Sequence, residues 1–323
     1  MAIDSTPSAE ERTGIISALA AYLFWGLLPI YFIVLADVRA DELLVHRILW
    51  SVPFGALIVT LRGQWPDVLG ALKKPKLLLW LTVTSFIIGA NWLTYIVAVQ
   101  KERIFEASLG YYINPLLYVV IGVVFFRERL RPGQWLAVAL AALGVSILTV
   151  YGGELPLIAL FLAVSFAAYG SLRKLVAIGA MPGLFIETIV LAPLAGLWMA
   201  TLVSEQAHTF GTGLPISLLL LLAGPATVTP LVLFAISARR LPLTVIGFLQ
   251  FITPTMQFAV GLINGEPFTM AHALCFGFIW SAAILFVWDM LRNARRRGRP
   301  QAADGNAENS GAPEGERGER RPA

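Results

Sequence analysis

Residues 106–126 read EASLGYYINPLLYVVIGVVFF, a long apolar run with a polar beginning. The polar beginning contains Gly110, Tyr111, Tyr112, Asn114 and Pro115. The eleven residues that follow, 116–126, carry no charge. Because a membrane-spanning helix needs about 20 mostly apolar residues, this run predicts a transmembrane helix. Pro115 removes one backbone donor and clashes with the preceding turn, so we expect the helix to bend there.

A second stretch, LTVIGFLQFITPTMQFAVGLIN at 243–264, has the same design. When Pro115 is aligned with Pro254, Asn114 falls on Thr253 and Tyr111 on Gln250. Backbone groups freed at a kink inside the bilayer must be satisfied by protein, ligand or trapped water. The chain is therefore predicted to contain two kinked spans that present polar groups to an internal space.

The composition predicts an all-α integral membrane protein. Of 323 residues, 57% are hydrophobic and only 14% are charged, whereas soluble domains carry about 25% charged residues. The only cysteine, Cys275, excludes an intrachain disulfide. The net charge of +4 is typical of some nucleic-acid-binding proteins, but the placement of the cations argues against such a partner.

Ten apolar runs follow one another with short connections, which predicts ten transmembrane helices in a compact bundle. The runs cover about 14–35, 43–61, 77–99, 107–126, 133–151, 155–172, 182–203, 215–237, 242–263 and 269–290. We expect a cytoplasmic N-terminal segment at 1–13, a first five-helix repeat at 14–151, a second at 155–290 and a disordered cytoplasmic tail at 291–323.

The distribution of lysine and arginine predicts the orientation. With the N-terminus in the cytoplasm, the cytoplasmic segments as far as Arg299 carry seventeen of these residues. The outer loops carry only Arg39, Lys101 and Arg103. Positive charges accumulate on the cytoplasmic side of membrane proteins, so both termini are expected in the cytoplasm.

The two halves of the chain align at an offset near 140 residues. Pro53 then matches Pro193, and Arg47 matches Glu187. Because each half has an odd number of predicted spans, the second half is inverted in the membrane relative to the first. Inverted repeats with interrupted helices are typical of transporters that bind substrate between the repeats, near the middle of the bilayer.

His46, Arg47 and Glu187 are ionisable residues well inside predicted spans, where charge is costly and is usually functional. Arg47 either extends toward the outer interface or serves as an anion-attracting or proton-linked group. Neighbouring His46 either titrates near neutral pH or is a hydrogen-bonded structural residue. Glu187 is expected to pair with Lys174 or Arg173, or to carry a coupling proton.

Aromatic side chains and scattered amides accompany these charges. The candidates are Tyr22, Trp25, Asn91, Trp92, Tyr95, Tyr111, Tyr112, Asn114, Gln250 and Gln257. Each alone is compatible with ordinary packing. Together they are typical of a pocket for a small, partly polar organic molecule.

Several motifs are missing from the sequence. It contains no GxxxxGK[ST] phosphate loop, no Cys/His metal-ligand spacing and no evident Ser/His/Asp set. The paired acidic motifs of membrane prenyl transferases are also absent. We therefore expect no cofactor, no metal and no ATP hydrolysis, so that transport would use an ion or solute gradient.

The chain resembles the RarD branch of the drug/metabolite transporter superfamily, which is built from two EamA-type repeats. The resemblance covers about residues 13–289. It rests on FWGLLPIYF at 24–32, ADELLVHRILWS at 40–51, GANWL at 89–93, EASLGYYINPL at 106–116, YGSLRK at 169–174, IETIVLAP at 186–193, GFLQFITPT at 247–255 and FIW at 278–280. It implies ten spans, cytoplasmic termini and secondary transport of small organic solutes, usually export. Some members are labelled chloramphenicol-sensitivity proteins, and the family's substrates are mostly undefined.

These observations predict a secondary transporter of the plasma membrane, in bacteria the inner membrane, rather than an enzyme. The alternative is a membrane-embedded lipid-modifying enzyme, which would need clustered acids or metal ligands near one face. A sensor or scaffold would need a more distinctive cytoplasmic tail. The sequence leaves the substrate open. It also leaves open the coupling ion, for which protons are the candidate, and the oligomeric state, which is a monomer or a homodimer.

Overall fold

The computed structural model describes residues 9–126, 132–153, 155–238, 240–241, 245–246 and 249–297. Within these ranges the secondary structure is entirely helical. The helices are α1 (Ala9–Val34), α2 (Ala40–Leu61), α3 (Trp65–Leu72), α4 (Pro75–Gln100), α5 (Ile104–Phe126), α6 (Pro132–Gly152), α7 (Leu157–Leu175), α8 (Ala180–Ser204), α9 (Leu214–Leu221), α10 (Ala223–Ala238), α12 (Ile252–Ile263) and α13 (Met270–Arg297).

Seven helical segments in the described part are long and apolar enough to cross a membrane. They are α1, α2, α4, α6, α8, α9 together with α10, and residues 270–289 of α13. Leu157–Arg173 in α7 and all of α12 are shorter apolar helices, and α5 forms from the predicted run at 107–126. These helices establish an all-helical integral membrane protein, and the count of ten spans stays a prediction.

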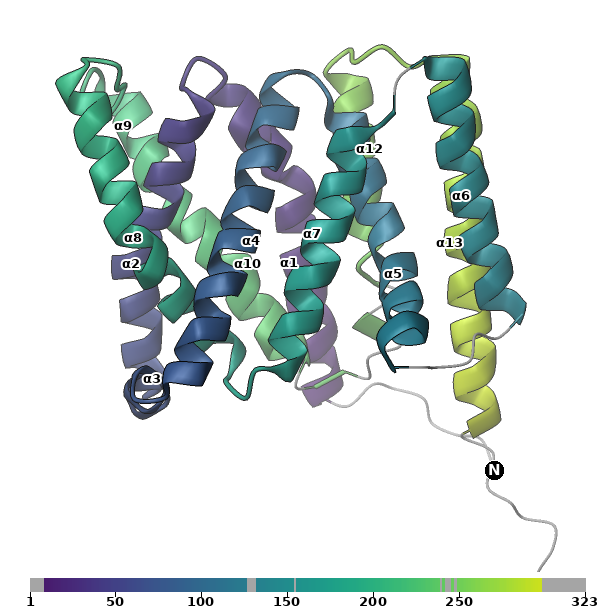
Figure 1. The fold of residues 1–323 in the computed structure, drawn as a ribbon, viewed down its shortest axis with the longest axis horizontal. Coiled ribbons are helices and arrows are strands. Elements are labelled where there is room, and N and C mark those ends of the chain that lie inside the picture. Colours follow the sequence, from purple (N-terminus) through teal and green to yellow (C-terminus); the bar gives the residue numbers. More distant parts are fainter. Residues whose placement is uncertain are drawn as a thin grey trace, which may run out of the picture.

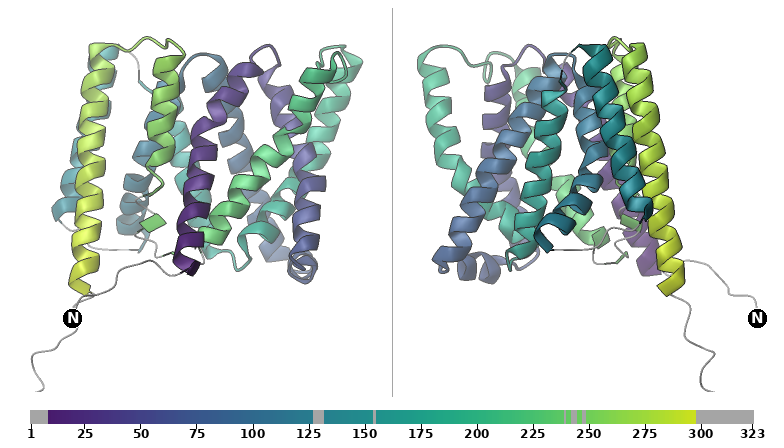
Figure 2. Two further views of the ribbon diagram at one scale, coloured as in Figure 1. Left: turned by 180° about the vertical axis from the view of Figure 1, so that it is seen from behind. Right: turned by 45° about the vertical axis from the view of Figure 1, so that its right-hand side comes forward.

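The helices run side by side between two faces at which the connections lie (Figure 1). In Figures 1 and 2, α1 begins and α13 ends at the lower face. The lower face also contains α3, and the upper face contains the connections α1–α2, α4–α5, α8–α9 and α12–α13. Many outward side chains are large and apolar, among them Ile16, Leu61, Val150, Leu197 and Ile284, as a lipid-facing surface requires.

Each helix packs on a defined set of neighbours. The pairs α2–α8, α5–α12 and α6–α13 are in contact, and α6 and α13 stand together at one end of the bundle (Figure 1). In the interior, α1 packs on α10 and α12, α7 packs on α4 and α5, α2 packs on α10, and α4 packs on α8. This arrangement brings α1, α2, α4, α5, α7 and α10 around the middle of the molecule.

Glycines allow two of these helix pairs to approach closely. A Cβ atom at Gly224 of α10 would lie 2.3 Å from the carbonyl oxygen of Trp50 in α2. A Cβ atom at Gly144 of α6 would lie 3.0 Å from the carbonyl oxygen of Cys275 in α13. Small residues at helix contacts are characteristic of membrane proteins, whose helices associate largely by close packing.

The structure differs from the expected spans in three places. The short helix α3 lies between the second and third runs. The run at 215–237 consists of α9 and α10, separated at Leu222. Helix α12 begins at Ile252, so Pro254 lies in its first turn, where a missing N–H removes no hydrogen bond within the helix. Pro115 lies inside α5, and a bend at either proline stays a prediction.

Candidate functional site

Arg47 is the eighth residue of α2, and its side chain is directed into the bundle, so that the residue is only 7% exposed. Its Nε donates a hydrogen bond of 2.8 Å to Oγ1 of Thr227 in α10. The guanidinium carbon lies 4.3 Å from the ring centroid of Trp92 in α4 and 6.0 Å from that of Phe32 in α1. Among the described residues, no acidic side chain forms an ion pair with Arg47. Aromatic faces and one hydroxyl therefore surround this cation.

Three tyrosines lie close to Arg47: Tyr31, Tyr95 and Tyr111. The hydroxyl of Tyr31 donates to the carbonyl oxygen of Leu219 at 2.9 Å. The hydroxyl of Tyr95 is buried and has no hydrogen-bond partner in the described part of the chain. The rings of Tyr95 and Tyr111 meet edge to face, with centroids 5.7 Å apart. We call Arg47, Trp92, Tyr95, Tyr111 and Thr227 the arginine cluster.

Glu187 is the eighth residue of α8 and is 1% exposed. Its carboxylate accepts hydrogen bonds from Thr84 Oγ1 in α4 at 2.6 Å and from the Tyr169 hydroxyl in α7 at 3.0 Å. Nε of Arg173, also in α7, lies 3.7 Å from Glu187 Oε1. We call Thr84, Tyr169, Arg173 and Glu187 the glutamate cluster. Unlike Arg47, Glu187 has an oppositely charged partner.

A row of aromatic rings connects the two clusters. The ring of Tyr111 in α5 lies 6.0 Å from that of Phe166 in α7, and Phe166 lies 6.2 Å from Tyr169. Tyr169 then donates its hydrogen bond to Glu187. The candidate residues on α2, α4, α5 and α8 are thus joined through the middle of the bundle.

His46 faces a different set of residues at the upper face. Glu42, which is fully buried, accepts hydrogen bonds from the backbone N–H groups of Thr209 and Phe210 at 2.6 and 3.0 Å. Nε2 of His46 lies 3.7 Å from the Glu42 carboxylate, and Nδ1 accepts a 3.0 Å hydrogen bond from Trp50 Nε1. His46 is therefore held against the α8–α9 connection rather than in the arginine cluster.

Trp25 and Gln257 meet between α1 and α12. The amide nitrogen of Gln257 donates to the Trp25 carbonyl oxygen at 3.3 Å, and its amide oxygen is buried with no partner among the described residues. The Trp25 ring lies 5.9 Å from that of Phe234 in α10. Phe234 in turn lines a pocket of about 160 Å³ between α2, α8 and α10.

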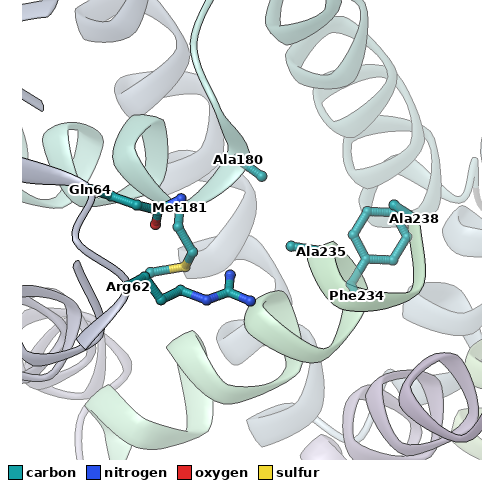
Figure 3. A pocket seen from close by; sticks show the side chains of 7 residues that line it. All are labelled: Arg62, Gln64, Ala180, Met181, Phe234, Ala235 and Ala238. Atoms are coloured by element: carbon teal, nitrogen blue, oxygen red, sulfur yellow. The ribbon is translucent and has the colours of Figure 1, made fainter. Parts of the chain in front are cut away.

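This pocket lies where α2 and α10 end and α8 begins, at the lower face. Its lining consists of Arg62, Gln64, Ala180, Met181, Phe234, Ala235 and Ala238 (Figure 3). Arg62 is the only charged residue in that set, and its side chain extends into the space between the helices (Figure 3). The lower face is thus hollowed next to the aromatic side chains of α1 and α10.

The two proline-bearing stretches meet along α5 and α12. The hydroxyl of Tyr112 lies 2.6 Å from Oγ1 of Thr255, and Oγ of Ser108 donates to the carbonyl oxygen of Pro254 at 2.7 Å. Tyr112 consequently faces α12, whereas its neighbour Tyr111 faces the arginine cluster. The sequence placed both tyrosines in one pocket, and the structure separates them.

Asn91 joins α4 to α7, because its amide donates to the Leu162 carbonyl oxygen at 3.1 Å and to Ser165 Oγ at 2.8 Å. Asn114 is buried, and its amide oxygen has no partner within the described ranges. Gln250 is half-buried, two residues before α12. The side chain of Lys174 lies outside the described residues.

Glu266, which follows α12, makes a specific contact with the first half of the chain. From the α12–α13 connection, its carboxylate accepts hydrogen bonds from the backbone N–H groups of Ile104 at 2.7 Å and Phe105 at 3.0 Å. Ile104 and Phe105 are the first two residues of α5. Burial raises the pKa of Glu266 to about 7, against the opposing effect of these hydrogen bonds.

Comparisons with known proteins identify the family. Residues 12–150 match the model of the EamA-like transporter family. The chain is 42% identical to an uncharacterized transporter of Vibrio cholerae, over 91% of this chain and 99% of that protein. It is 41% identical to the protein RarD of Escherichia coli, over 89% of this chain and 98% of that protein.

Two further comparisons agree. The uncharacterized transporter YojE of Bacillus subtilis is 39% identical, over 88% of this chain and 96% of that protein. One solved crystal structure has a TM-score of 0.56 at 18% identity, covering 87% of this chain and 99% of its own, a likeness that concerns the fold alone. The chain is a membrane transporter that belongs to the RarD family of the drug/metabolite transporter superfamily, with EamA-type sequence in its first half.

Proposed function

We propose that this protein is a secondary transporter that carries a small organic solute out of the cytoplasm by alternating access. The observation that carries the proposal is the pair formed by Arg47 and Glu187. Each is the eighth residue of its helix, and the two helices, α2 and α8, pack against each other and begin at opposite faces. A buried charge in each half, connected by aromatic rings, provides a central binding region of the kind that inverted-repeat transporters use.

The packing of the helices supports an inverted repeat of two five-helix halves. The proposed equivalents are α1 and α7, α2 and α8, α4 and α9–α10, α5 and α12, and α6 and α13. The contacts of α1 with α10 and α12 then correspond to those of α7 with α4 and α5, and the contact α2–α10 corresponds to α8–α4. The pairs α2–α8, α5–α12 and α6–α13 each join equivalents, as a two-fold axis requires.

Two carboxylates support a state that is closed at the upper face. Glu42 of the first half binds backbone N–H groups of the α8–α9 connection in the second half. Glu266 of the second half binds backbone N–H groups at the start of α5 in the first half. The pocket opens at the opposite, lower face. With that face in the cytoplasm, as the lysines and arginines predict, this is the state that loads solute for export.

Proton coupling is assigned to Glu187 or His46. Protonating Glu187 would weaken its attraction for Arg173 and so loosen α8 from α7. Protonating His46 would strengthen its attraction for Glu42 and so tighten the upper face. In either case the proton would bind more tightly in one state of the alternating-access cycle than in the other. Such a difference in affinity between the two states is the requirement for coupling.

The test is solute flux in proteoliposomes with and without a pH gradient, using a solute identified by comparing the media of cells with and without the gene. The wild type is expected to accumulate the solute against its gradient only when a pH gradient is imposed. Glu187→Gln or His46→Ala is expected to retain downhill flux and to lose this accumulation. If both variants accumulate the solute as the wild type does, neither Glu187 nor His46 carries the coupling proton. If the wild type shows no flux, the protein does not transport that solute.

A reporter fused after residue 297 tests the orientation, since it is expected in the cytoplasm. Light scattering on the purified protein separates the monomer from the homodimer.

A further inference from the structure

We infer that the arginine cluster binds the negatively charged group of the substrate and that the transported solute is a small organic anion, a carboxylate in particular. The inference rests on the proposed transport function and assigns a substrate class to its central region.

The first observation is the electrostatic isolation of Arg47. A buried cation is expensive unless it is paired. Arg39 lies 2.7 Å from Asp41, and Arg173 lies 3.7 Å from Glu187. Arg47 is 7% exposed and has no carboxylate partner in the part of the chain that the structure describes. An anionic ligand would supply the missing counter-charge.

The second observation is the set of hydrogen-bond donors that remain. A guanidinium has five N–H groups in a planar fork that matches a carboxylate. Nε of Arg47 is bound to Thr227, which fixes the orientation of the fork, and the two terminal nitrogens have no hydrogen-bond acceptor among the described residues. The buried hydroxyl of Tyr95 is likewise without a partner there. These groups suit a carboxylate bound by two arginine N–H groups and one phenol.

The third observation concerns the surroundings of this site. Trp92, Phe32 and the ring pair of Tyr95 and Tyr111 lie around the guanidinium. Flat rings pack well against a flat or apolar body. The anion should therefore carry an apolar or aromatic portion.

The pocket at the lower face favours the same charge. Among the described residues, Arg62 is the only charged residue that lines it, and a positively charged pocket raises the local concentration of anions. Glu187 provides no competing site for a cation, because Arg173 already neutralises it.

The experiment is an untargeted comparison of metabolites in medium and cells. It uses cells that lack the gene and cells that express the wild type, Arg47→Gln, Arg47→Lys or Arg39→Gln. Arg39→Gln is the matched control, because it makes the same change at an exposed arginine near the upper face. Fluorescence-detected size exclusion confirms that each variant is folded and equally abundant. The exported solute and its uncharged amide are then compared in proteoliposomes.

The expected solutes are anions at neutral pH, and the amide is not carried. Arg47→Gln should reduce their flux about 30-fold or more, since truncating one partner of a buried charge pair costs about 2 kcal/mol or more. Arg47→Lys keeps the positive charge but loses the planar guanidinium, so it should transport the same solute with a raised KM. If Arg47→Gln fails to fold, this raised KM tests the role of Arg47 instead. Arg39→Gln should match the wild type.

Export of uncharged or cationic solutes only would overturn the anion inference and leave the transport function standing. Wild-type flux of an anion by Arg47→Gln would overturn the role of Arg47. No difference between cells with and without the gene would refute the proposed function and the inference together.

Discussion

The carboxylate of Glu266 lies 2.7 Å from the backbone nitrogen of Ile104, although the two residues are 162 positions apart. A side chain between α12 and α13 thereby satisfies N–H groups at the start of α5, which the helix itself leaves without acceptors. The same carboxylate also accepts from Phe105. The contact between the α12–α13 connection and the start of α5 consequently depends on an ionisable group.

Stability should depend on pH through Glu266. Its pKa is raised from 4.5 to about 7, so between these values the folded protein holds a proton that the unfolded chain has released. The stability contributed by this group is therefore lost as pH rises through about 7. Glu266→Gln does not titrate, so the Tm of the wild type should fall relative to that of Glu266→Gln between about pH 5 and about pH 8. Thermal unfolding of the detergent-solubilised full-length chain measures this difference.

Glu205→Gln is the control for that comparison, because Glu205 is an exposed residue at the upper end of α8. Its Tm should follow that of the wild type at every pH. A wild-type curve parallel to that of Glu266→Gln would contradict the assignment.

Glu42→Gln should release the connection between α8 and α9. Glu42 accepts from the backbone N–H groups of Thr209 and Phe210, and a hydrogen bond to a charged acceptor contributes about 1.5–3 kcal/mol. Hydrogen exchange of a peptide covering 205–213 should be roughly tenfold faster or more in the variant. Asp41→Asn, which leaves both amides bound, should exchange like the wild type; equal rates in all three proteins would rule out the proposed fastening.

Glu187 and Arg173 should be energetically coupled. Removing one partner of a buried pair leaves the other charge uncompensated and costs about 3 kcal/mol. Glu187→Gln and Arg173→Met are each expected to be destabilising, and the double variant should lose less than the sum of the two. Thr84→Val, which deletes one hydrogen bond to Glu187, should cost about 1 kcal/mol. Denaturant unfolding in detergent measures the cycle, and strict additivity would contradict the pairing.

Gly224→Ala should separate α2 from α10. The added methyl group would lie 2.3 Å from the Trp50 carbonyl oxygen, and overpacking of this kind costs about 1–3 kcal/mol. Since Thr227 lies one turn further along α10, the variant should also weaken its hydrogen bond to Arg47 and reduce transport. Unfolding and flux measurements check both effects.

Gly70→Ala is the matched control, because the added Cβ would meet no described atom within 4 Å apart from the adjoining backbone of its own helix. In the interior of α3, alanine should stabilise the helix by about 0.5–1 kcal/mol relative to glycine. If Gly224→Ala were as stable as Gly70→Ala, α2 and α10 would not be in the close contact described.

Arg47 and Glu187 could be singled out from the sequence as candidates, because a charge within an apolar run is conspicuous. The sequence was not sufficient to find their partners. Thr227 is 180 residues from Arg47, and Thr84 is 103 residues from Glu187. Hydroxyl residues are common in membrane helices, and only the rotation of each packed helix decides which of them face a charge. Glu42 had a visible signal, since it stands four residues before His46 on the same helix.

The helices were predictable where the length of an apolar run determines them. They were less predictable where individual residues determine a short helix or a break. The break at Leu222 had a signal in Gly224 and Pro225, because proline is favoured in the first turn of a helix. Helix α3 had a similar signal in Pro66, near its beginning. No sequence signal indicated that Tyr111 faces the arginine cluster whereas Tyr112 faces α12. Adjacent residues on a helix point in different directions, and only the packing of the neighbouring helices decides what each of them meets.

The isolation of Arg47 has an electrical consequence. With a monovalent anion bound, the centre of the transporter is neutral, whereas the empty centre carries one positive charge. A transmembrane voltage acts on a moving charge by about 2.3 kcal/mol per 100 mV. Voltage should therefore govern the return of the unloaded carrier and leave the loaded step nearly unaffected.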